Sequence, residues 1–176
     1  MRILRWIGIV VIVLAVVFVA GAYLLPREVT ITRSIEVNAP ADQVFPHVNS
    51  MKATEGWSPW LERDPNVQLT YTGPDEGVGA TLAWASDQRD VGVGTQVIVT
   101  SETDKRVETD LDFGDMGTAK AAFILDPAGE GTNVTWTLVT DMGNSPMGRW
   151  MGLMMDGLIG PDYEAGLANL KALVEG

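Results

Sequence analysis

The strongest constraint on this chain is an uninterrupted apolar segment near its start. Twenty uncharged residues, Trp6–Leu25, lie between Arg5 and Pro26. As a helix rising about 1.5 Å per residue, they span roughly 30 Å, the thickness of a bilayer's hydrocarbon core. We therefore expect residues 1–26 to form a transmembrane anchor and residues 27–176 to form the remaining domain.

A cleaved signal peptide is the competing interpretation of this segment, because Ala20–Ala22 resembles a cleavage site. Tyr23–Leu25 continues the apolar run past that point, which favours a retained anchor. No two small residues four positions apart lie in the span, so nothing there predicts a helix dimer, and we expect a monomer.

The arginines around the segment predict its orientation. Arg2 and Arg5 precede it and only Arg27 follows it. Because cytoplasmic flanks carry the excess of basic residues, the N-terminus should be cytoplasmic. We expect a single pass through the cytoplasmic (inner) membrane, with the domain on the extracytoplasmic side.

The rest of the chain has a different composition. The formal net charge is −11, and all 23 acidic residues follow position 26 with 10 of the 12 basic ones, so residues 27–176 carry −13. Phosphate binding needs a basic surface, which argues against nucleic acid as a partner. About 150 residues suit one domain with its own core. The chain has no cysteine, which excludes disulfides and thiolate sites.

Beyond Arg27 the sequence shows β-strand patterns separated by turn residues. Residues 38–42 (NAPAD) predict the start of a short helix with Asn38 as its N-cap, and Pro46 limits its length. Short connections between consecutive strands indicate an antiparallel meander. The predicted strands are residues 29–37, 67–72, 78–85, 91–100, 106–113, 119–125 and 133–140.

One face of the predicted sheet is apolar and needs a cover. Val107 and Leu111, for example, alternate with Glu108 and Asp110. The last segment repeats large apolar residues at helical spacing, so we expect it to cover that face, with an interruption at residues 160–161 (Gly-Pro). Its apolar stripe is Met147, Met151, Met154, Leu158, Tyr163, Leu167, Leu170 and Val174.

Four stretches in this order carry a family resemblance: residues 31–40 (ITRSIEVNAP), 57–60 (WSPW), 131–136 (GTNVTW) and 147–170. With them the chain resembles the START / polyketide-cyclase / birch-pollen-allergen superfamily (SRPBCC), in particular a bacterial subgroup with an N-terminal membrane segment. The resemblance implies an α+β helix-grip fold, in which a curved antiparallel sheet of about seven strands wraps around a long C-terminal helix. It also implies a deep cavity for apolar ligands and no shared catalytic machinery.

Aromatic and methionine side chains are the candidate lining of this cavity. Five of the six tryptophans follow the apolar segment, and methionine's flexible thioether suits a cavity with variable contents. A packed core without ligand is the alternative for each residue. We expect Trp57 and Trp60 near the mouth. The expected wall is Leu82, Trp84, Leu111, Phe123, Trp136, Met151 and Met155.

Signals for catalysis, metals or cofactors are weak. His47 is the only histidine, no serine lies in a G-x-S-x-G motif, and the acidic residues 110–115 lack the spacing of a calcium loop. We therefore assign no catalytic residue, metal ligand or cofactor. For an enzyme, Tyr71, Arg89 and His47 are the only polar candidates for the cavity.

Three functions remain open from the sequence. The first is a membrane-anchored binding domain for a lipid-like or other apolar small molecule. The second is an enzyme of the polyketide cyclase or hydrolase kind. The third is a membrane-tethered, chaperone-like interaction module, whose acidic surface would favour a basic protein partner.

Overall fold

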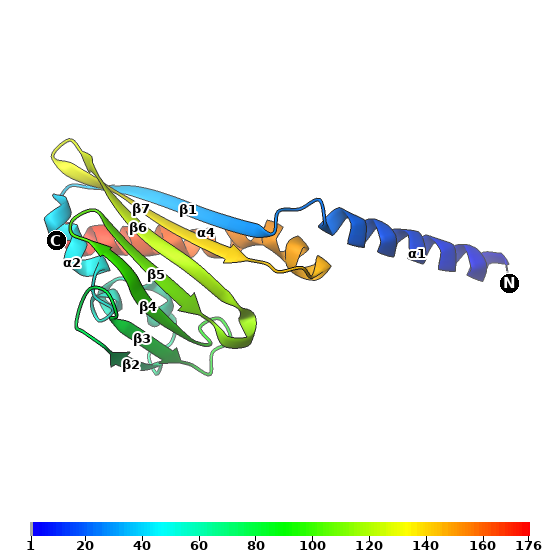
Figure 1. The fold of residues 1–176 in the computed structure, drawn as a ribbon, viewed down its shortest axis with the longest axis horizontal. Coiled ribbons are helices and arrows are strands. Elements are labelled where there is room, and N and C mark those ends of the chain that lie inside the picture. Colours follow the sequence, from blue (N-terminus) through cyan, green and yellow to red (C-terminus); the bar gives the residue numbers. More distant parts are fainter. Residues whose placement is uncertain (1) are drawn as a thin grey trace.

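The apolar segment forms a helix that projects from the rest of the chain, which folds into a sheet packed with helices (Figure 1). The structure is a computed structural model and describes residues 2–176. Helix α1 (Arg2–Ala22) has 21 residues, and Ala22 is its only buried one. Its length and composition are those of a helix that can cross a membrane.

The domain contains a seven-stranded antiparallel sheet in the order β1-β7-β6-β5-β4-β3-β2. All seven predicted strands are confirmed, and their observed bounds differ from the predicted ones by a few residues. Consecutive strands from β2 to β7 are neighbours, and β1 pairs with β7. The strands are β1 (Glu28–Val37), β2 (Gln68–Thr72), β3 (Thr81–Ala85), β4 (Val93–Glu102), β5 (Arg106–Asp112), β6 (Thr118–Ala128) and β7 (Gly131–Asp141).

Short helices connect β1 to β2. They are α2 (Ala41–Val48), the 3-10 turn η1 (Ala53–Gly56) and α3 (Pro59–Arg63); a further 3-10 turn, η2 (Gly114–Met116), joins β5 to β6. The prediction that Asn38 caps α2 is wrong, because the helix starts after Pro40, which occupies the N-cap position. Figure 1 shows α2 near the C-terminal end of the long helix.

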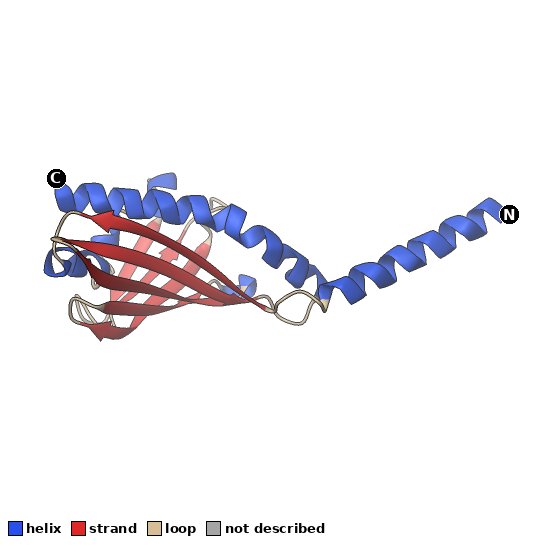
Figure 2. Ribbon diagram, turned by 90° about the horizontal axis from the view of Figure 1, so that it is seen from above, coloured by secondary structure: helices blue, strands red, loops and turns tan. Residues whose placement is uncertain are grey.

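The C-terminal helix α4 (Pro146–Glu175) is continuous over 30 residues. The predicted interruption at Gly160–Pro161 is therefore wrong. Proline removes one backbone donor, so the helix loses one hydrogen bond there and the turns on either side persist. Figure 2 shows the consequence as a bend part-way along α4.

The two halves of α4 face the domain differently. In the second half, Tyr163, Leu167 and Leu170 are buried, as the prediction of a cover for the sheet requires. In the first half the prediction is wrong: Met147, Met151, Met154 and Leu158 of the predicted stripe are exposed, and so is Leu153.

Small residues occupy the domain-facing side of this first half. A Cβ at Gly148 would overlap the carbonyl oxygen of Met142, and one at Gly152 would lie 3.0 Å from Cγ2 of Val29 in β1. Gly148 lets α4 approach Met142, directly after β7, and Gly152 lets it approach β1, so the larger side chains of this half point away from the domain.

Candidate functional site

Five aromatic rings, from four elements and the loop after η1, fill the space between the sheet and the second half of α4. Trp136 on β7 stacks on Tyr163 of α4, with ring centroids 3.8 Å apart, and on Phe123 of β6 at 4.8 Å. Trp57 and Trp60 meet Trp136 edge-on, at 5.4 and 5.8 Å. We call these five residues the aromatic cluster. Such contacts stabilise more than burial of their area alone.

The register of the sheet and two local features assemble the cluster. Phe123 and Trp136 are direct partners across β6 and β7. The indole N–H of Trp57, which follows η1, donates to the carbonyl oxygen of His47 at 3.0 Å. A Cβ at Gly166 would lie 2.9 Å from Cζ3 of Trp136, so glycine is needed for α4 to come this close.

The cluster contains one fully buried polar atom without a hydrogen-bond partner. The Nε1–H of Trp136 is buried and has no hydrogen-bond partner among residues 2–176. Burial raises the pKa of the Tyr163 hydroxyl well above its usual range, so that side chain stays neutral. A buried unpaired donor costs free energy, and an acceptor brought by a ligand would satisfy it.

The structure brings four of the nine predicted ligand-binding residues together in this cluster: Trp57, Trp60, Phe123 and Trp136. Sequence reasoning missed Tyr163, although its helical spacing with Leu167 and Leu170 placed it on the covered face. The expectation that Trp57 lies near the mouth is wrong, since it is 3% exposed and packs inside the core.

The remaining predicted residues lie elsewhere in the interior or on α4. Trp84 meets Phe113 edge-on at 5.9 Å, and its indole N–H donates to the carbonyl oxygen of Val91. Leu82 is buried and Leu111 is half-buried; both pair with Gln96 of β4. On α4, Met155 packs against the core and Met151 is 50% exposed.

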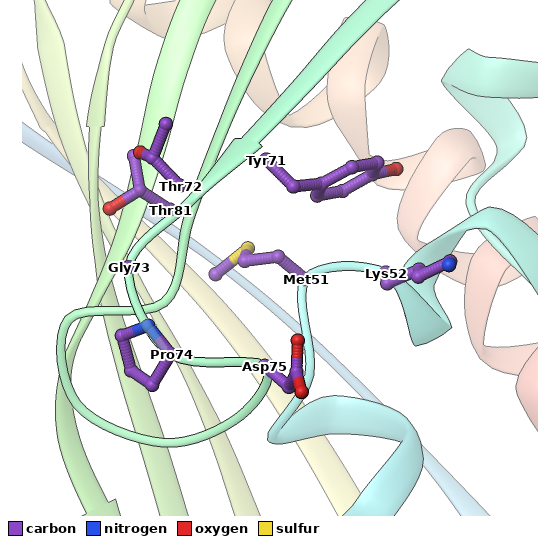
Figure 3. A pocket seen from close by; sticks show the side chains of 8 residues that line it. All are labelled: Met51, Lys52, Tyr71, Thr72, Gly73, Pro74, Asp75 and Thr81. Atoms are coloured by element: carbon purple, nitrogen blue, oxygen red, sulfur yellow. The ribbon is translucent and has the colours of Figure 1, made fainter.

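Two cavities lie outside the aromatic cluster. The smaller, of about 100 Å³, is bounded by Met51, Tyr71 and Pro74, among other residues (Figure 3). The larger, of about 430 Å³, lies beside Asp64, Gln68 and other residues at the edge formed by β2 and β3. Because the rings of the aromatic cluster stack on one another, a ligand among them would have to displace side chains.

The polar residues nominated for catalysis are dispersed. The Tyr71 hydroxyl donates to Oε1 of Glu55 at 2.8 Å, and burial raises its pKa above the usual range. Arg89 is exposed in the β3–β4 connection, and His47 lies on α2. Among residues 2–176, no group of three His, Asp or Glu side chains could hold a metal ion.

An ion-pair group that the sequence did not reveal fixes α4 to β1. Nη1 of Arg33 donates to Oδ1 of Asp156 at 2.9 Å, and Nε donates to Oε1 of Glu164 at 2.7 Å. The two carboxylates lie on either side of Pro161 in sequence. Arg33 therefore holds both halves of the bent helix against the edge strand.

Comparison with known proteins supports this architecture. A profile of the family described as "Polyketide cyclase / dehydrase and lipid transport" matches residues 28–175, which is nearly the whole domain. The chain belongs to this family. No curated protein sequence matches the chain.

Solved structures show the same fold for this polyketide cyclase/dehydrase and lipid transport domain. Ara h 8.0201 superimposes with a TM-score of 0.59 at 11% identity, over 84% of this chain and 97% of that one. Protein CV1439 from Chromobacterium violaceum gives 0.56 at 17%, over 84% and 97%. The di-domain ARO/CYC StfQ of the steffimycin biosynthetic pathway gives 0.63 at 13%, over 84% and 51%. These likenesses confirm the helix-grip fold.

Proposed function

We propose that this protein is a membrane-anchored binding domain for a lipid-like or other apolar small molecule, which is held between the sheet and α4. Residues 1–26 are the anchor and residues 27–176 the binding domain in this proposal. Family membership supports the class of ligand. The apolar helix α1 supports the anchor.

The observation that carries the proposal is the unpaired Nε1–H of Trp136 inside a cluster of aromatic rings. Ligand sites are mostly apolar, with a few polar groups that orient the ligand. The ligand would therefore have an apolar body and one hydrogen-bond acceptor, such as a carboxylate, carbonyl or hydroxyl oxygen. The half-buried side chains of Trp60 and Met155 would move to admit it.

The proposed sidedness follows from the flanking arginines. Arg2 and Arg5 remain on the cytoplasmic side, and the domain lies outside the inner membrane. The one cation directly after the span, Arg27, is paired with Asp141 at 2.5 Å. Because Asp141 neutralises the charge of Arg27, the excess of positive charge at the Arg2 and Arg5 end of α1 becomes larger. The linker from Ala22 to Glu28 is short, so the domain stays at the membrane surface.

The test begins with native mass spectrometry of the full chain released from nanodiscs, which should show a bound apolar molecule. Binding of a fatty acid, a fatty alcohol and an alkane is then measured by tryptophan emission. Trp136→Phe should weaken acid and alcohol binding about five- to tenfold, as loss of one hydrogen bond predicts, and leave alkane binding nearly unchanged.

Trp84→Phe is the matched control, because the Trp84 indole already donates within the protein. It should bind all three probes like the unmodified chain. Absence of a bound molecule, together with unchanged emission for every probe, would overturn the proposal. Equal weakening by both variants would remove Trp136 as the orienting donor.

A further inference from the structure

The first half of α4 carries an apolar surface that does not pack against the rest of the domain. Met147, Met151, Met154 and Leu158 follow one another at spacings of four, three and four, so they form one stripe. Their exposed fractions run from 50% for Met151 to 63% for Met147. We call these four residues the methionine face. A contiguous exposed apolar stripe of this kind marks an interaction site.

This half of α4 is fixed to the end of α1. The ring of Trp150 stacks on Phe18, with centroids 5.6 Å apart, and its Nε1–H donates to the Phe18 carbonyl oxygen at 3.1 Å. Nη1 of Arg149 donates to the carbonyl oxygen of Leu25 at 3.0 Å. The start of α4 therefore lies beside the last turns of α1.

These contacts determine how deep α4 would lie. Phe18 precedes Ala22, the last residue of α1, by four residues, or about 6 Å along the helix. If α1 spans the membrane, Trp150 lies at the same depth as Phe18, below the level of the headgroups. Interfacial helices bury their apolar side by about this amount.

The directions of the two helices agree with this placement. Figure 2 shows that α1 and the first half of α4 meet in a V, with the sheet on the other side of α4. The methionine face lies opposite Gly152, which packs against Val29 of that sheet. It is therefore turned towards the region through which α1 runs.

We propose that the methionine face lies in the interfacial region of the bilayer leaflet from which the domain emerges, beside α1. This inference rests on the proposed function, because it requires α1 to be a membrane anchor. Acyl chains would cover the stripe, while Arg149 reaches the headgroup region as basic side chains at interfaces do. The domain carries −13, so apolar contact and not charge would hold it to an anionic surface.

The placement gives the ligand a short path. Met155 is adjacent to Met154 of the methionine face and packs against the core. A lipid leaving the leaflet would therefore contact the first half of α4 before it contacts water.

Because the chain has no cysteine, single-cysteine variants can be labelled without background. The full chain carrying Met154→Cys, Ala168→Cys or Val13→Cys is labelled with an environment-sensitive fluorophore and reconstituted in phosphatidylcholine vesicles. Ala168 is an exposed position in the second half of α4, and Val13 lies in the middle of α1. Emission is compared with and without bromine on the acyl chains.

We expect the labels at residues 154 and 13 to be quenched by brominated lipid and the label at 168 to be unaffected. If the label at 13 is quenched and that at 154 behaves like that at 168, the interfacial placement is wrong and the anchor stands. If the label at 13 is not quenched, the anchor in the proposed function fails as well. A label at 154 shielded from aqueous iodide but untouched by brominated lipid would show that protein covers the face, which also overturns the inference.

Discussion

The guanidinium of Arg33 on β1 packs directly against Gly160 of α4, at the bend of the long helix. A Cβ at Gly160 would lie 2.8 Å from Cζ of Arg33. The guanidinium binds Asp156 before the bend and Glu164 after it. Pro161 removes one backbone hydrogen bond of α4. At this position Arg33 ties both halves of the helix to the sheet.

The first prediction concerns this contact. Gly160→Ala should lower the free energy of unfolding by about 1–3 kcal/mol, the usual cost of overpacking. Gly157→Ala is the control, because nothing lies within 4 Å of its added Cβ. Helix propensity alone should make that variant about 0.5–1 kcal/mol more stable. Urea denaturation measures both changes, and equal effects would show that Arg33 does not restrict the site.

The second prediction is a pH dependence. The hydrogen bond from Arg33 lowers the pKa of Asp156 from its ordinary value of 3.8. The ionised carboxylate therefore stabilises the fold above that pH, and the contribution is lost as the pH falls through the lower, folded-state pKa. Asp156→Asn should be less stable than the unmodified chain at pH 7, and the difference in stability should shrink as the pH falls below 3.8. Melting temperatures of both proteins across this pH range measure the difference in stability. A difference that stays constant with pH would contradict the prediction.

A third prediction concerns Asp64, which is 5% exposed. Its carboxylate accepts from the backbone N–H of Asn66 at 2.8 Å and from the Ser86 hydroxyl at 2.5 Å. Asp64→Ala should cost about 1–3 kcal/mol, because both donors lose their partner. The exposed neighbour Asp87 provides the control, and Asp87→Ala should change stability by less than about 0.5 kcal/mol. Similar losses for the two variants in chemical denaturation would refute the role of Asp64.

The fourth prediction concerns access to the aromatic cluster. Trp60 is its half-buried member, so Trp60→Ala should open the interior. Stopped-flow mixing with a fatty acid should show faster uptake, and stability should fall by up to about 3–5 kcal/mol. Trp84→Ala removes a half-buried tryptophan that packs on Phe113 instead. It should destabilise the domain without faster uptake, and faster uptake in that control would argue against a specific gate at Trp60.

Local patterns predicted most of the architecture. Alternation along strands such as residues 106–113 reflects a period of two that any half-buried strand must have, and every predicted strand is present. The same patterns placed Trp57 incorrectly. Its burial depends on a hydrogen bond to the carbonyl oxygen of His47, a contact between a side chain and a backbone position ten residues away that no periodicity contains.

Helical spacing also left one decision open. It showed that Met147, Met151, Met154 and Leu158 share a side of α4, but sharing a side does not say which way that side points. The direction depends on Gly152 and Gly160, which bring the opposite side against Val29 and Arg33. Close approach at these glycines outweighs burial of the methionines.

The sequence by itself determined the apolar length of α1, the strand order of the meander and the covering role of the second half of α4, because length and periodicity are properties of consecutive residues. Only the tertiary structure decided that five aromatic rings meet around an unpaired indole N–H, that Arg33 binds both sides of the bend, and that Trp150 packs on Phe18. Each of these relationships joins residues distant in the chain, and their positions become related only when the sheet and helices pack together.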